Sequence, residues 1–158
     1  MVNVILFILA VAFTICRLTL KKEWYSPKSE ETFLSYLLFF NVGLMGVLGA
    51  YAHVFLADEI ARSIGWAPGS PFQFEMAMAN LAFGVLGILS YWIRGRFWDA
   101  TIIGWSVLFV GCFVGHVMEY YTKNNTAPYN IGPYIWFYDL ILPILVIALL
   151  YRIRFAKR

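Results

Sequence analysis

Residues 104–121 read GWSVLFVGCFVGHVMEYY, a stretch apolar enough to cross a bilayer that places an imidazole and a carboxylate one helical turn apart. At 100° per residue, one narrow side of the predicted helix carries Gly104, Gly111, Cys112, Gly115 and Glu119, with His116 at its edge. Small residues allow another helix to approach closely, so we expect this side to face protein and not lipid. Ionisable groups within a membrane segment cost roughly 2.5–3.5 kcal/mol on insertion scales, and they therefore indicate a functional site.

The composition of the whole chain agrees with this interpretation. Of the 158 residues, 61% are hydrophobic and 13% are charged, whereas a soluble domain is about half apolar and a quarter charged. The lipid bilayer is therefore the expected environment. The net charge of +3 comes from basic residues beside apolar runs, which favours a role in membrane orientation and gives no reason to expect a nucleic-acid partner. Cys16 and Cys112 both lie inside predicted spans, so we expect no structural disulfide.

Five apolar runs are long enough to span, each near the ~20 residues that a hydrocarbon core of about 30 Å requires. Their predicted bounds are 2–20, 33–57, 72–93, 100–121 and 133–151. The loops between them are short, so the sequence predicts one all-α transmembrane domain over residues 1–158, a bundle of five helices. We expect the first run to be retained, because its basic residues follow it and no Ala-x-Ala cleavage site is present.

The basic residues predict the orientation of this bundle. Ten of the twelve Lys and Arg residues fall on one side of the five-span topology, and only Arg62 and Lys123 fall on the other. The positive-inside rule then places the N-terminus outside and the C-terminus in the cytoplasm.

Local signals mark where the helices begin and bend. Ser70, Pro71 and Gln73 predict a capping box, with serine at the cap, proline at the first helical position and glutamine at the third. Asp99 is expected to cap the fourth helix. Pro143 interrupts the fifth helix and should kink it or free a backbone carbonyl.

Several ionisable side chains share one depth in the predicted outer half. His53 lies about one turn from the outer end of the second span, His116 and Glu119 occupy the outer end of the fourth, and Asp139 lies about 10 Å into the fifth at 1.5 Å per residue. Glu75 is at a similar depth on the third span but nearly opposite its small-residue side, so we keep it in reserve. Asn80, one turn deeper, is a supporting polar residue.

Metal binding is the function that this set predicts first. His and carboxylate ligands suit zinc, iron or manganese, and the His-x-x-Glu spacing of His116 and Glu119 lets two ligands from one helix reach one ion. The expected ligands are His53, His116, Glu119 and Asp139, with Glu75 in reserve. Each residue also has a plainer interpretation, in which it only bonds a neighbouring helix or sits among lipid headgroups.

Three other functions remain open at this stage. Chains of Asp, Glu and His inside a bundle are typical of proton-coupled transport, although here the ionisable residues stop at mid-depth. The glycine faces favour instead a structural subunit, either a homo-oligomer or part of a larger membrane complex. Haem ligated by His53 and His116 is a further alternative. Aromatic residues including Tyr120 could also line a tunnel for a lipid or quinone headgroup. The sequence does not name a reaction.

Several strings resemble a family of small multi-pass prokaryotic membrane proteins of unknown function. They are SPFQFEMAMANLAFGVLG at 70–87, GCFVGH at 111–116 and N-x-x-P-x-N-x-G at 125–132, followed by Asp139 and Pro143. The resemblance covers roughly residues 40–150, and Ser-Pro-Phe-Gln-x-Glu at Ser70–Glu75 is its most specific part. It implies a helical bundle in a prokaryotic cytoplasmic membrane. It implies no catalytic role, because the family has no assigned activity.

Overall fold

The computed structural model describes residues 2–26 and 28–155, and within these residues all regular structure is helical. Five helical stretches are long and apolar enough to cross a membrane: Val2–Lys21, Lys28–Phe55, Phe72–Leu89, Arg96–Lys123 and Pro128–Phe155. The expectation of an all-helical protein with five helices able to span a bilayer is confirmed. The orientation of the termini stays a prediction, and Lys157 and Arg158, which contribute to it, lie outside the described residues.

The elements follow one another along the chain as a series of helices with two π-helical segments. The order is α1 (Val2–Lys21), α2 (Lys28–Leu37), η1 (Leu38–Leu44), α3 (Met45–Phe55), α4 (Ala57–Ile64), α5 (Phe72–Leu89), α6 (Arg96–Lys123), α7 (Pro128–Ile131), α8 (Pro133–Ile135), η2 (Trp136–Ile141) and α9 (Leu142–Phe155). The second, fourth and fifth helical stretches begin earlier than predicted. Asp99 consequently lies inside the first turn of α6, and its predicted role as a cap is wrong.

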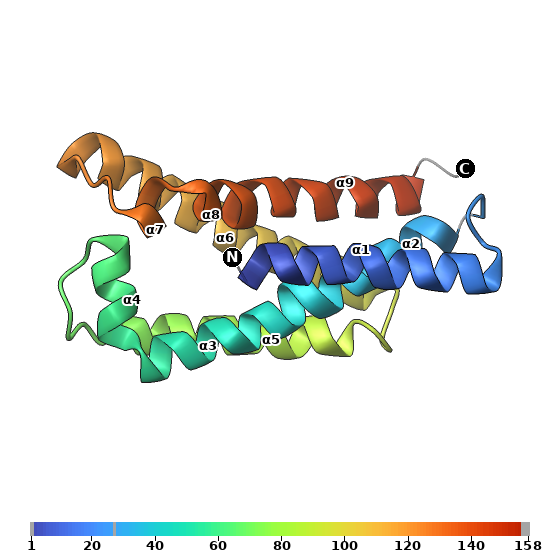
Figure 1. Cartoon of the computed structure of the whole chain (residues 1–158), viewed down its shortest axis with the longest axis horizontal. Helices are drawn as coiled ribbons and strands as arrows, with labels where there is room; N and C mark the ends of the chain where they lie inside the picture. The colour runs from blue at the N-terminus through green and yellow to red at the C-terminus, as the bar shows by residue number, and fades with distance from the viewer. Residues whose placement is uncertain (1, 27, 156–158) are drawn as a thin grey trace.

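The five stretches form a bundle with two chemically different ends (Figure 1). At the end that we call the basic end, α1 and α9 finish and α2 and α6 begin. At the end that we call the far end, α3 and α6 finish, α5 begins, and α4 and α7 contact each other. Asn3, near the start of α1, accepts a hydrogen bond on its backbone oxygen from Asn41 Nδ2 of η1, at 3.1 Å. Because η1 lies in the middle of the second span, α1 covers only the part of the bundle nearer the basic end.

The two π-helical segments meet in the middle of the bundle. The Tyr138 hydroxyl of η2 donates a hydrogen bond to the backbone oxygen of Asn41 in η1, at 3.0 Å. Pro143, just beyond η2, has no N–H to donate to the carbonyl of Asp139 four residues earlier, which explains why the regular hydrogen-bond pattern is lost there. The expected disturbance at Pro143 is therefore present, in the form of a π-helical segment. Such segments occur frequently at functional sites.

Glycines bring η1 and α3 into close contact with α5. A Cβ added at Gly46 would lie 2.7 Å from the Cα of Gly84, and one added at Gly87 would lie 2.7 Å from the Cα of Gly43. No side chain fits between backbones at this distance, so these four positions require glycine. Close approach of this kind replaces the hydrophobic driving force that helices lack in lipid.

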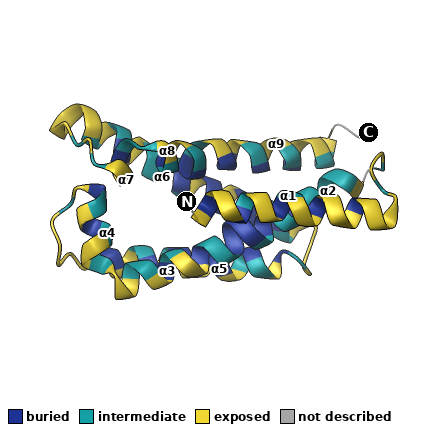
Figure 2. Ribbon diagram, viewed as in Figure 1, coloured by how far each residue is buried: buried dark blue, intermediate teal, exposed yellow. Residues whose placement is uncertain are grey.

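The buried core lies toward the basic end, where α1, α2, η1, α6, η2 and α9 meet (Figure 2). Its largest fully buried side chains are Trp98 and Trp105 of α6 and Tyr138 of η2. The rings of Trp105 and Tyr138 meet edge to face, with centroids 5.7 Å apart. Helices α3 and α5 contribute to this core only partly buried side chains, Met45 and Phe83, among the described residues.

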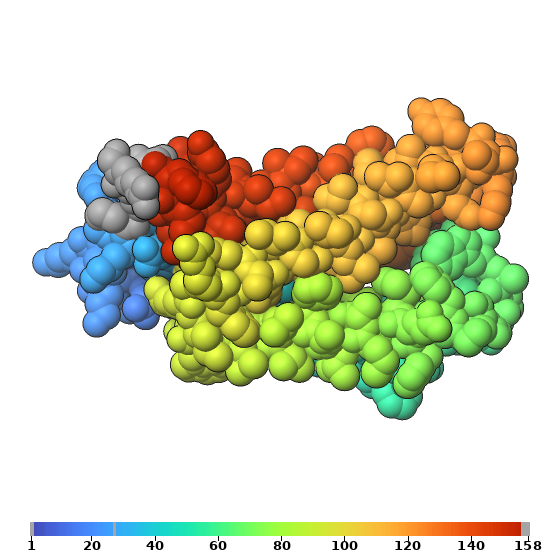
Figure 3. Space-filling view, turned by 180° about the vertical axis from the view of Figure 1, so that it is seen from behind, coloured from blue at the N-terminus to red at the C-terminus, as the bar shows by residue number. Residues whose placement is uncertain are grey.

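Helices α5 and α6 diverge toward the far end. A Cβ added at Gly104 would lie 3.2 Å from the ring of Phe83 on α5, whereas one added at Gly111 or Gly115 would meet nothing within 4 Å. Figure 3 shows a crevice between the green α5 and the orange part of α6. The expectation that this glycine side faces protein is therefore correct at Gly104 and wrong at Gly111 and Gly115, as far as the described residues of this chain go.

Candidate functional site

His53 is held between α3 and α5 by an amide. Its Nδ1 lies 2.7 Å from Oε1 of Gln73, in the first turn of α5. Gln73 is 2% exposed, and its Nε2 has no hydrogen-bond partner among the described residues. The side chain of Gln73 therefore reaches across to α3, so the predicted capping box is wrong in its glutamine. Ser70 Oγ does accept a bond from the backbone N–H of Phe72, at 3.3 Å.

The end of α4 positions an indole over the fourth span. Gly65 ends α4 with φ +86°, a left-handed conformation that favours glycine, and the N–H of Trp66 then returns to the Ala61 carbonyl at 2.8 Å. This turn lays the ring of Trp66 against that of His116, with centroids 6.0 Å apart and planes 14° from parallel. The short helix α4 is thus fixed to the far end of α6.

Asn130 of α7 bonds His116 twice. Its Oδ1 lies 2.9 Å from His116 Nδ1, and its Nδ2 donates to the backbone oxygen of His116 at 3.2 Å. Nδ2 also donates to the backbone oxygen of Asn125 at 2.8 Å. His116 is 9% exposed and Asn130 is fully buried, so these bonds replace water around both side chains.

Glu119 lies at the rim of the same arrangement. Its Oε2 accepts hydrogen bonds from Trp66 Nε1 and from Asn125 Nδ2, both at 3.2 Å, and its Oε1 pairs with Lys123. Asn125 Nδ2 also donates to the backbone oxygen of Ile64 at 2.9 Å. We call the set Trp66, His116, Glu119, Asn125 and Asn130 the far-end cluster. Its bonds join α4, α6 and α7, which makes it a clamp that closes one end of the bundle.

Asp139 is separate from this cluster. It lies in η2 and is 4% exposed. The carboxyl lies close enough to the Cys112 thiol of α6 and the Tyr134 hydroxyl of α8 for electrostatic interaction. Cys112 is adjacent to Gly111, which borders the crevice between α5 and α6. The buried acid therefore lies near a part of α6 that the described residues leave open.

The other two predicted residues at this depth do not face the bundle interior. Glu75 is exposed on α5, as its position opposite the small residues of that helix indicated. Tyr120 is 36% exposed and contacts the ring of Tyr121 edge to face. Asn80 is buried, as expected of a supporting polar residue, but its Nδ2 bonds the Met76 carbonyl of its own helix at 2.9 Å.

The predicted metal ligands thus occupy distinct surroundings. Within residues 2–26 and 28–155, no three His, Cys, Asp or Glu side chains come together in a group that could hold a metal ion. His53, His116 and Glu119 each bond an amide or indole instead. Binding of zinc, iron or manganese by these residues stays a prediction, and it would require them to exchange those partners.

The residues that sequence reasoning missed are mainly amides. Gln73 was assigned to a helix start, and Asn125 and Asn130 entered only through a family pattern. The sequence signal for the two asparagines was the N-x-x-P-x-N-x-G pattern. Its amides bond the His116 ring and the backbone carbonyls of Ile64 and Asn125. Gly132 in this pattern is also explained, since a Cβ there would collide with the Pro128 carbonyl.

Comparison with known proteins places the chain in a family without supplying an activity. No curated protein and no solved structure matches it. Residues 1–158 match the profile described as "Family of unknown function (DUF6790)", so the chain belongs to that family.

Proposed function

We propose that this multi-pass membrane protein moves protons across the bilayer, as a channel or a proton-coupled transporter, and that Asp139 binds and releases the proton. The burial of its carboxyl without a hydrogen-bond or ion-pair partner among the described residues carries the proposal. Asp139 is 4% exposed, and it forms no hydrogen bond or ion pair with any other residue that the structure describes. Burial of an unpaired carboxylate costs several kcal/mol, so a carboxyl at this depth is stable when it holds a proton or a cation. Intramembrane acids of this kind serve proton relays.

The backbone around Asp139 supports the same function. The fifth span changes from α8 to η2 and then to α9 within residues 133–142, and Pro143 leaves the Asp139 carbonyl without its α-helical donor. Broken helices at mid-membrane are the usual place for ion and proton sites in transporters. An interrupted helix can also change shape at low cost when the acid gains or loses its proton.

Polar groups continue from the neighbour of Asp139 across the bundle at mid-depth. This neighbour, Tyr138, bonds the Asn41 carbonyl, and Asn41 bonds the carbonyl of Asn3. The Oδ1 of Asn41 and the Nδ2 of Asn3 are buried without a partner among the described residues. Such atoms are places where internal water binds. Neutral polar groups with room for water therefore lie beside Asp139 at mid-depth, which supports proton transfer within this part of the bundle.

Proton flux in proteoliposomes tests the proposal. Vesicles containing the full chain and an internal pH-sensitive dye receive an external acid pulse. We expect a proton flux above that of empty vesicles, and we expect Asp139→Asn, which keeps the size of the side chain, to reduce it to the empty-vesicle level. Glu75→Gln is the matched control. Glu75 is exposed, so its substitution should leave the flux unchanged. No flux with the unmodified chain, or equal flux in Asp139→Asn, would overturn the proposal.

A second candidate is a subunit role, supported by the open side of α6. Gly111 and Gly115 have no neighbour within 4 Å of an added Cβ, and Val114 and Met118 on this side are 51% and 60% exposed. Glycine faces in membranes bind helices, so a second copy or another subunit is the natural occupant. The mass of the detergent-solubilised protein tests this function: an oligomer dissociated by Gly115→Leu supports it, and a monomer with or without the substitution counts against self-association.

A further inference from the structure

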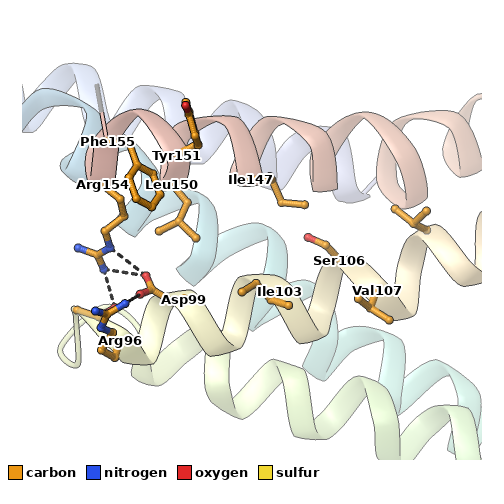
Figure 4. Close-up of a pocket in the computed structure, with 12 residues that line it drawn as sticks. Arg96, Asp99, Ile103, Ser106, Val107, Ile147, Leu150, Tyr151, Arg154 and Phe155 are labelled. Atoms are coloured by element: carbon orange, nitrogen blue, oxygen red, sulfur yellow. Dashed lines mark hydrogen bonds and ion pairs between the residues drawn. The ribbon is translucent and has the colours of Figure 1, made fainter. Parts of the chain in front are cut away.

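A groove separates α6 from α9 at the basic end (Figure 4). Its volume is about 940 Å³, near the top of the range of about 300–1,000 Å³ for ligand sites. Apolar side chains form its walls, among them Ile103 and Val107 of α6 and Ile147 and Leu150 of α9. It follows α6 from Gly95 to Val110, about 22 Å at 1.5 Å per residue. That length exceeds one leaflet of a hydrocarbon core of about 30 Å.

Two guanidinium groups and one carboxylate stand at the mouth of this groove (Figure 4). Arg154 of α9 donates to Asp99 Oδ1 at 2.9 and 3.0 Å and to the Gly95 carbonyl at 2.7 Å. Arg96 Nη1 lies 3.3 Å from Asp99 Oδ2. Two positive charges share one negative charge, so the mouth carries a net positive charge. The side chain of Arg96 is 97% exposed, which leaves most of its donors free for a ligand.

The neighbouring arginines, Arg94 and Arg152, are instead each paired with a carboxylate. Arg94 pairs with Glu31 at 3.8 Å, and Arg152 pairs with Glu30 at 2.7 Å, so a carboxylate faces each of them. The mouth also lies at the N-terminus of α6, whose cap residue Gly95 supplies no side-chain hydrogen bond. The first N–H groups of a helix carry partial positive charge. The electrostatics of this end therefore favour an anion at Arg96 and Arg154.

We propose that this groove binds one anionic phospholipid from the adjacent leaflet. Its phosphate contacts Arg96 and Arg154, and an acyl chain lies along Ile103, Val107 and Ile147. A free inorganic anion would leave the apolar walls unused, and an apolar helix would leave the guanidinium groups unused. A phospholipid with net negative charge uses both. Arginine pairs phosphate strongly, and basic pockets between membrane helices bind anionic headgroups. The inference does not depend on the role of Asp139.

Lipid retention tests this site. The full chain is purified in mild detergent, mixed with equal amounts of phosphatidylglycerol and phosphatidylcholine of identical acyl chains, and weighed by native mass spectrometry. We expect phosphatidylglycerol to be retained on the chain in preference, and we expect Arg96→Gln to weaken that preference by about tenfold, as loss of a charge-assisted bond to phosphate predicts. Arg62→Gln is the control, because Arg62 is an exposed arginine at the far end that pairs with Asp58 at 3.8 Å.

A second variant addresses the apolar wall without touching the charges. Val107 is 70% exposed, so Val107→Trp can fold while filling the groove. It should lower retention of phosphatidylglycerol, and native spectra of the folded variant should keep the charge-state distribution and the oligomeric state of the unmodified chain. The proposal is overturned if neither lipid is preferred, if Arg96→Gln and Arg62→Gln behave alike, if inorganic phosphate competes as well as the lipid does, or if a second copy of the chain occupies the groove.

Discussion

The close contact between η1 and α5 provides the sharpest test of the packing. A Cβ introduced by Gly87→Ala would lie 2.7 Å from the Cα of Gly43 and 2.8 Å from the Leu38 carbonyl oxygen. Carbon atoms normally meet at about 3.5–4.0 Å, so the two backbones must separate by about 1 Å. Because neither neighbour is a flexible side chain, rotation of a rotamer cannot relieve the collision.

The magnitude follows from two opposing effects. Overpacking of a close contact costs about 1–3 kcal/mol. Replacement of a helical glycine by alanine returns roughly 0.5–1 kcal/mol of backbone entropy. Because both neighbours are backbone, the upper part of the overpacking range applies, about 2–3 kcal/mol, and we expect Gly87→Ala to lower the free energy of unfolding by about 1–2.5 kcal/mol.

Gly111→Ala is the matched control, with the same substitution in another membrane helix. A Cβ there meets nothing within 4 Å, so only the entropy gain remains and stability should be unchanged or higher. Both variants are unfolded reversibly in mixed detergent micelles and followed by far-UV circular dichroism. A Gly87→Ala variant as stable as the unmodified chain would refute the packing described here. Equal destabilisation by Gly111→Ala would show that the open side of α6 is covered by a partner.

The remaining predictions concern individual side chains. Tyr138→Phe should lower the free energy of unfolding by about 1–3 kcal/mol, because the buried Asn41 carbonyl loses its donor, and the same micelle titration measures it. Asn125→Ala removes bonds to both Ile64 and Glu119, so limited proteolysis between α4 and α5 should become faster while α1 stays protected; unchanged cleavage would contradict the clamp. Mixing zinc, iron or manganese with the purified protein should leave less metal bound in His116→Ala than in the unmodified chain if the predicted ligands exchange their amide partners, and equal metal content in both would exclude His116 as a ligand.

Much of the fold could be predicted from the sequence because its signals are local. A run of twenty apolar residues identifies a span without any knowledge of its neighbours, and all five runs were found. The glycine faces were also visible in the sequence, and Gly46 and Gly84 do pack together. The two π-helical segments are different. Pro143 indicated a break in the fifth helix, whereas η1 contains no proline and packs mainly against α5, a contact that no local sequence signal gives.

The candidate site was predictable only in part. The sequence indicates the depth of a residue along its helix, but it does not indicate the neighbouring side chain that the residue bonds. His53, His116 and Asp139 lie in the helices in which they were predicted, and His116 and Asp139 are buried. Their partners come from amides whose side chains can point to any neighbouring helix. Gln73 shows the difficulty most clearly, since its place at a helix start suggested a cap while its side chain bonds His53. The divergence of α5 and α6 depends on long-range packing and left no mark in the sequence.

The protonation of Asp139 is the measurement that tests the central claim most directly. Infrared difference spectra of the reconstituted protein, recorded across a pH titration, detect the carbonyl stretch of a protonated carboxylic acid in an apolar environment. We expect such a band, its loss on deprotonation, and its absence from Asp139→Asn while Glu75→Gln keeps it. A spectrum without the band, or one that Asp139→Asn leaves unchanged, would contradict the assignment of Asp139 as the proton-binding group.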